Sequence, residues 1–92
     1  MIREENEQFI VYCPTRTDWM DVLYKATKNG WQWRGFETED KWYAMWENHE
    51  NQSCIFFEED KRLTYSGKNT YEQTDFFNNI PIISAEEYIK NY

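Results

Sequence analysis

The sequence predicts one α+β domain over residues 1–92, in which a small antiparallel sheet packs against one amphipathic helix and a short helix ends the chain. A chain of 92 residues has room for a single hydrophobic core. Aromatic residues make up 20% of it, so the mean hydropathy of −0.99 reflects abundant polar residues rather than a missing core. Segments with the period of a strand and of a helix follow one another without repeats or linkers, which indicates mixed secondary structure.

The first predicted element is a buried strand at Phe9–Cys13, which follows a polar arm at residues 1–8. Its run "FIVYC" is nearly continuous in β-branched and aromatic residues, and Pro14 closes it. A buried run of this kind is typical of a central strand, so we expect it in the middle of the sheet.

An amphipathic helix is predicted next, with Thr17 or Asp18 as its N-cap and Asn29-Gly30 as its end. Four apolar residues at positions i, i+3, i+4 and i+7 form the stripe that would face the core, namely Trp19, Val22, Leu23 and Ala26.

The middle of the chain is rich in tryptophan and predicts further strands. Trp31-Gln32-Trp33 alternates as a strand does, which places both rings on one face. The segment Trp42–Glu47, "WYAMWE", fits both a strand and a helical turn, and we favour the strand. Cys54–Phe57 and Leu63–Tyr65 flank a charged stretch, so we expect a β-hairpin with a charged tip.

The last third of the chain ends in a predicted helix. Residues 67–79 are polar with scattered aromatics, which fits a short helix or an ordered loop. Ser84-Ala85-Glu86-Glu87 is a capping box, and Ile83 with Tyr88 can form the hydrophobic staple that accompanies one. A short terminal helix therefore begins after Ser84.

Charge and composition narrow the expected partners and cellular location. The net charge of −7 opposes attraction to a phosphate backbone, so nucleic acid is not expected as a partner. The chain lacks a signal-peptide core and a membrane-length apolar stretch, which leads us to expect a cytoplasmic protein without membrane attachment. Cys13 and Cys54 lie in apolar runs far apart in sequence, as reduced, buried thiols do.

No catalytic constellation is visible, and we do not expect an enzyme. The single histidine, His49, lies in a polar segment without a local nucleophile, and with Cys54 it does not complete a zinc ligand set. The three glycines form no phosphate-binding run, and adjacent carboxylates such as Glu58-Glu59 are typical of a solvated surface. No metal or cofactor is therefore expected.

Surplus aromatic residues beside charges instead predict a binding surface. Some tryptophans, such as Trp31, Trp33 and Trp46, can fill the core, yet a domain of this size hardly hides eighteen aromatic side chains completely. Exposed aromatics next to charges are typical of interaction hot spots. The candidate partner-binding residues are Trp33, Arg34, Glu37, Glu39, Asp40, Trp42, Glu58, Glu59 and Asp60.

Two other interpretations of these residues stay open. Arg34 can form an ordinary salt bridge to Glu37, Glu39 or Asp40. A tryptophan-lined pocket could also bind a signalling nucleotide, with rings stacking on the base and a cation holding phosphate. The residues for that alternative are Trp33, Arg34, Lys41, Trp42 and Trp46.

The order of the motifs "VYCPT", "KNGWQWRG", "SCIFF", "RLTYSG" and "IPIISAEEYI" resembles a group of small proteins encoded by bacteriophages and prophages of Gram-positive bacteria. The resemblance implies an anti-defence protein, similar to anti-CRISPR proteins, that inhibits a host protein stoichiometrically in the cytoplasm of the infected cell. A nucleotide sponge, or a phage structural or regulatory protein, is the alternative. A homodimer would cover leftover apolar surface, although no particular residue points to one.

Overall fold

The computed structural model describes residues 8–92, which form five strands, four α-helices and two 3₁₀ helices. In chain order these are β1 (Phe9–Tyr12), α1 (Arg16–Lys28), β2 (Gln32–Trp33), α2 (Glu39–Glu47), η1 (Glu50–Gln52), β3 (Ser53–Phe57), β4 (Arg62–Gly67), α3 (Lys68–Gln73), η2 (Asp75–Phe77), β5 (Ile82–Ser84) and α4 (Ala85–Asn91). The α+β class is confirmed. The predicted polar arm lies outside the described residues, apart from Gln8.

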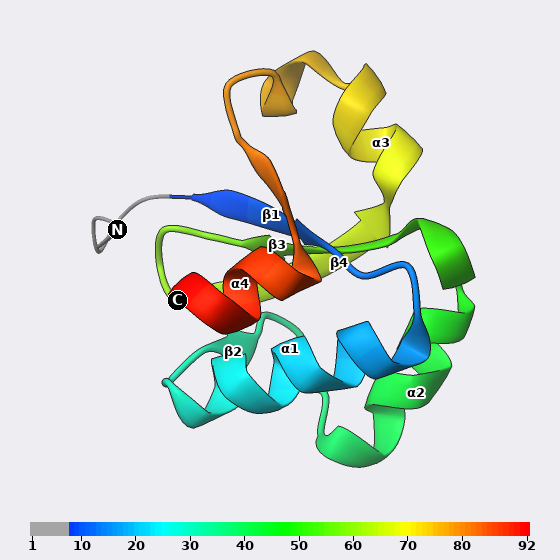
Figure 1. The fold of residues 1–92 in the computed structure, drawn as a ribbon, viewed down its shortest axis with the longest axis vertical. Helices are drawn as coiled ribbons and strands as arrows, with labels where there is room; N and C mark the ends of the chain where they lie inside the picture. The colour runs from blue at the N-terminus through cyan, green and yellow to red at the C-terminus, as the bar shows by residue number, and fades with distance from the viewer. Residues whose placement is uncertain (1–7) are drawn as a thin grey trace.

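The five strands form one mixed sheet in the order β2-β4-β3-β1-β5 (Figure 1). β3 pairs antiparallel with both β1 and β4, whereas β5 joins β1 and β2 joins β4 in parallel. The prediction of a purely antiparallel sheet is therefore wrong at both edges. Each edge strand is reached through helices, as parallel pairing requires: α1 precedes β2, and the segment with α3 and η2 precedes β5.

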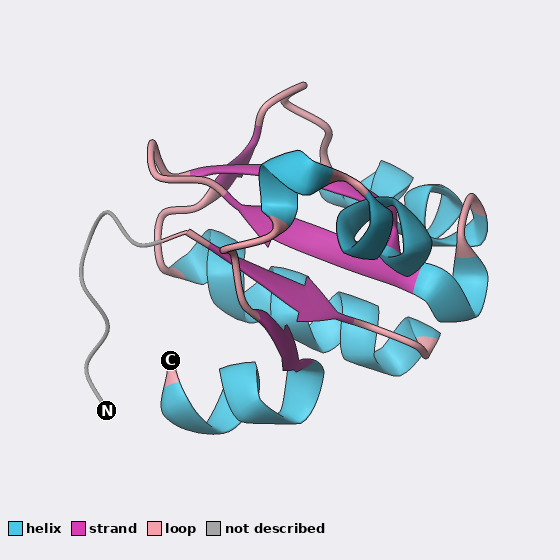
Figure 2. Ribbon diagram, turned by 90° about the horizontal axis from the view of Figure 1, so that it is seen from above, coloured by secondary structure: helices cyan, strands magenta, loops and turns pink. Residues whose placement is uncertain are grey.

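Helices lie on both faces of the sheet, so the expectation of a single packing helix does not describe this fold (Figure 2). Alternate residues of β1 show the two faces. Phe9 and Val11 join the larger core with α1, α2 and α4, while Ile10 packs in a smaller cluster with Tyr71 of α3. β1 is buried almost throughout and lies inside the sheet, as predicted.

α1 begins one residue after Thr15, whose hydroxyl accepts a hydrogen bond from the backbone N–H of Asp18 at 3.1 Å. The predicted caps, Thr17 and Asp18, lie inside the first turn, because Thr15 already satisfies a free N–H there. The predicted end is confirmed, since Gly30 takes a φ of 95° directly after Asn29. The four residues of the predicted apolar stripe are all buried, namely Trp19, Val22, Leu23 and Ala26.

The segment Trp42–Glu47 is helical, so the preferred strand is wrong. α2 starts after Thr38 and carries Glu39 and Asp40 in its first turn, where carboxylates complement the helix dipole. Trp42 and Met45 face the core, which is the spacing of the helical alternative. The backbone carbonyl of Trp42 also accepts a hydrogen bond from the Trp19 indole N–H at 2.8 Å, which ties α2 to α1.

Two further local predictions are confirmed. β3 and β4 form a hairpin whose tip turns through Lys61, with a φ of 67°. The hydroxyl of Ser84 accepts a hydrogen bond from the Glu87 N–H at 3.0 Å and caps α4. Residues 67–79, left open between helix and loop, contain α3 and η2.

Both cysteines are free thiols buried on opposite faces of the sheet. Burial raises the pKa of Cys54 to about 12 and that of Cys13 well above its ordinary value. Because the thiolate is the reactive form, we expect the folded protein at pH 8 to react with a disulfide reagent at least ~100-fold more slowly than a free thiol. Rapid labelling of the folded protein would contradict this, and unfolding in denaturant should expose both thiols.

Candidate functional site

The parallel pairing of β2 with β4 places Arg34 beside the hairpin tip. Trp33 lies opposite Leu63 in the register, and the backbone N–H of Arg34 donates to the Leu63 carbonyl at 2.9 Å. The hairpin tip between β3 and β4 therefore lies next to the Arg34 side chain, although the two are more than twenty residues apart in sequence.

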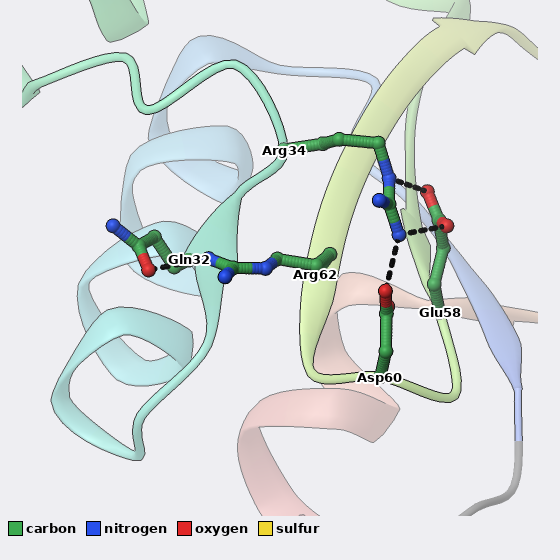
Figure 3. Close-up of polar contacts among 5 residues, drawn as sticks. All are labelled: Gln32, Arg34, Glu58, Asp60 and Arg62. Atoms are coloured by element: carbon green, nitrogen blue, oxygen red, sulfur yellow. Dashed lines mark hydrogen bonds and ion pairs between the residues drawn. The ribbon is translucent and has the colours of Figure 1, made fainter.

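Arg34 holds the tip through two carboxylates (Figure 3). Its guanidinium Nη2 lies 2.7 Å from Oε1 of Glu58 and 2.6 Å from Oδ2 of Asp60. We call Arg34, Glu58 and Asp60 the Arg34 cluster. Arg34 thus forms salt bridges, but not with the predicted partners Glu37, Glu39 or Asp40. The pairing of β2 with β4 brings Glu58 and Asp60 within its reach instead.

The Arg34 cluster carries a net charge of −1 and is open to solvent. The side chain of Arg34 is 49% exposed, so water and salt screen the attraction and the pairs orient the loop more than they stabilise the fold. The hydrogen bond from Arg34 lowers the pKa of Asp60. The stability that this pairing of Asp60 contributes is therefore fully present above the carboxyl's unfolded pKa of about 3.9, and it is lost as the pH falls through the lower pKa of the folded state.

Phe36 is an exposed aromatic residue in a strained backbone conformation. Its φ is 61°, a region that bulky side chains rarely adopt, and its side chain is 62% exposed. The Phe36 N–H donates to the carbonyl of Trp33 at 2.9 Å, and the Arg62 guanidinium lies 5.2 Å from the centre of the ring. The left-handed conformation costs about 1–2 kcal/mol for a residue with a Cβ.

Arg62 also donates a hydrogen bond to the side-chain oxygen of Gln32 (Figure 3), so it links Gln32 to the Phe36 ring. We call the resulting patch the Phe36 surface; it comprises Gln32, Arg34, Phe36, Glu58, Asp60 and Arg62. On the face of the sheet covered by α3 and η2, the buried strand residues come from β1 and β3. β2 and β4 instead carry the polar side chains of Gln32 and Arg62, which are not buried.

Two of the predicted binding residues belong to the core. Trp33 and Trp42 are only 2% and 5% exposed, and Trp33 packs against Trp19 and Tyr65 with ring centres 6.0 and 5.7 Å apart. Neither ring offers a face to a ligand, and the indole N–H of each is buried without a hydrogen-bond partner among the described atoms. The large aromatic side chains that are exposed are others, namely Tyr24, Phe36, Tyr43 and Phe76.

The remaining candidates are dispersed. Glu39 accepts a hydrogen bond from the Tyr24 hydroxyl at 2.6 Å, and Asp40 accepts one from Thr38, which lowers the pKa of Asp40. Glu37 lies against Gly35 in the loop before α2. Glu59 is exposed at the hairpin tip and makes no ion pair within residues 8–92.

Lys41 and Trp46, proposed for a nucleotide, do not gather with the others. Lys41 is exposed in the first half of α2. Trp46 is half-buried near the other end of this helix, where its indole N–H donates to the Cys13 carbonyl at 3.3 Å. With Trp33 and Trp42 in the core, no stacking ring of that set is fully open.

The Phe36 surface includes residues that sequence reasoning missed. Sequence reasoning did not select Phe36, whose positive φ is a property of the backbone, and it placed Arg62 in the charged hairpin tip without a binding role. The single histidine, His49, packs its ring 5.8 Å from that of Tyr65. Within residues 8–92, no three His, Cys, Asp or Glu side chains are arranged to hold a metal ion.

Comparison with known proteins gives no assignment: the chain matches no protein-family model, no curated protein and no solved structure. The longest described helix, α1, has 13 residues, and none of the helices in residues 8–92 is long and apolar enough to cross a membrane. The function is therefore inferred from the surface of the molecule.

Proposed function

We propose that the protein acts by binding another protein stoichiometrically through the Phe36 surface. The observation that carries the proposal is Phe36 itself, a large ring that is 62% exposed on a backbone held at a φ of 61°. An exposed aromatic contributes little to folding, and strained residues of this kind concentrate at binding and catalytic sites.

The surroundings of Phe36 fit a protein partner. Aromatic residues and arginines are the side chains that most often dominate binding energy, and here the guanidinium of Arg62 lies over the Phe36 ring. Carboxylates at the hairpin tip favour a partner with a basic surface, among them Glu59, which has no ion pair within residues 8–92. The net charge of −7 favours the same kind of partner. The resemblance to phage proteins makes a host defence component the expected partner and inhibition the expected result.

The test is native mass spectrometry of the tagged protein, purified gently from Gram-positive cells that carry active defence systems. We expect one host protein to co-purify at a fixed ratio. The Glu59→Lys variant should retain about fivefold less of it, since the charge reversal faces a basic partner and leaves the Arg34 cluster intact. An added mass of nucleotide size, without a protein, would instead support the sponge.

The matched control is Asp21→Lys, which makes the same change of charge on an exposed residue of α1. It should retain the partner as the unmodified protein does. Equal losses with both variants would show that only net charge matters, and no loss with either would remove the hairpin tip from the interface.

A further inference from the structure

An open pocket of about 530 Å³ lies at the C-terminal end of α2, away from the Phe36 surface. The loop before α1 and the first residues of α1 form one wall, and α2 with η1 forms the other. The side chains that determine its chemistry are Arg16, Tyr43, Trp46, Glu47 and Glu50.

Two aromatic rings line this pocket. Trp46 is fixed, because its indole N–H donates to the Cys13 carbonyl at 3.3 Å and its own carbonyl accepts from the Ser53 hydroxyl at 3.1 Å. Tyr43 is 43% exposed, and the Arg16 guanidinium lies 4.3 Å from the centre of its ring. The pocket thus already contains one cation on an aromatic face, which is the geometry of a cation–π contact.

The charges around the rings favour a second cation. Glu47 and Glu50 are exposed, and neither forms an ion pair with any residue in 8–92. Against the single charge of Arg16 they leave the pocket at −1. Glu47 is also the last residue of α2, whose final turn carries no basic residue, so the negative end of the helix dipole is uncompensated there.

We propose that this pocket binds a positively charged side chain, arginine or lysine, of a protein partner. The cation lies on the indole of Trp46 and pairs with the carboxylates of Glu47 and Glu50, while Arg16 stays on the ring of Tyr43. An anion would meet Arg16 and the N-terminus of α1, but the two carboxylates and the end of α2 oppose it.

This site is independent of the proposed function at the Phe36 surface. Phe36 precedes the first residue of α2, and Glu47 is its last. A partner could contact both ends of this helix, but either site can fail in a test without affecting the other.

The test is a titration of the ¹⁵N-labelled protein with N-acetyl-arginine amide, followed by NMR at low salt. The Trp46 indole N–H signal, identified by its absence in Trp46→Phe, should shift with an affinity in the millimolar range. The neutral isostere N-acetyl-citrulline amide lacks the charge, so its affinity should be lower by about fivefold or more.

A double variant, Glu47→Gln with Glu50→Gln, should weaken binding of the arginine probe by about fivefold. The control, Asp21→Asn with Glu87→Gln, removes the same charge at exposed residues of α1 and α4 and should leave binding of the probe unchanged. Inorganic phosphate should not move the Trp46 signal. The proposal is overturned if the citrulline probe binds as well as the arginine probe, if phosphate binds instead, or if neither shifts Trp46.

Discussion

Trp19→Ala is expected to lower the free energy of unfolding by about 3–5 kcal/mol, a large part of the total stability of a domain of this size. Trp19 is completely buried between α1 and the sheet. Its ring contacts Trp33 and Tyr65, with centres 6.0 and 5.7 Å away, and these rigid neighbours cannot collapse into the space that the indole leaves. Urea unfolding followed by circular dichroism measures the change.

Trp19→Phe is the matched control for this prediction. Phenylalanine keeps most of the buried apolar volume but cannot donate the hydrogen bond to the Trp42 carbonyl, so we expect a smaller loss of about 1–3 kcal/mol. A loss below about 1 kcal/mol for Trp19→Ala would mean that α1 does not pack as described.

Local signals made much of this fold predictable. The apolar stripe of α1, the glycine that ends it and the capping box of α4 depend on residues within one or two turns of each other. The hairpin of β3 and β4 was equally local, since two apolar runs flank a short charged tip. Such features are encoded in neighbouring residues and need no knowledge of the rest of the chain.

The fold predictions were wrong where the local sequence fits two secondary structures equally well, or where it holds no information on strand pairing. "WYAMWE" satisfies both periodicities, and tertiary packing decided for the helix, because Trp42 and Met45 reach the core from α2. The parallel edges of the sheet depend on how helices carry the chain across it, and no residue of β2 or β5 indicates its partner.

The arrangement of the residues in the Phe36 surface was predicted less well than the fold, for the same reason. Arg34 and its hairpin-tip carboxylates were among the candidates, but their pairing depends on β2 lying beside β4. Hydrophobicity alone could not separate the buried tryptophans from the exposed aromatics. The strain at Phe36 is a property of the backbone and leaves no mark in composition.

Phe36→Asn is expected to lower the affinity for the captured partner by about 30-fold or more, while leaving the protein at least as stable as before. Loss of an aromatic hot spot costs about 2 kcal/mol or more of binding energy. Asparagine tolerates the left-handed region at Phe36 far better than phenylalanine, which offsets the lost contact with Arg62. Calorimetric titration and urea unfolding measure the two effects separately.

Phe76→Asn serves as the control, since Phe76 is 72% exposed on η2 and adopts no positive φ. It removes a ring that is at least as exposed as that of Phe36 and should leave affinity unchanged. For a binding role, affinity must fall in Phe36→Asn while stability does not fall. Removing a ring that serves folding would lower stability, whereas removing a strained ring that serves a partner lowers only affinity. A variant that unfolds more easily and binds normally would therefore assign Phe36 to the fold.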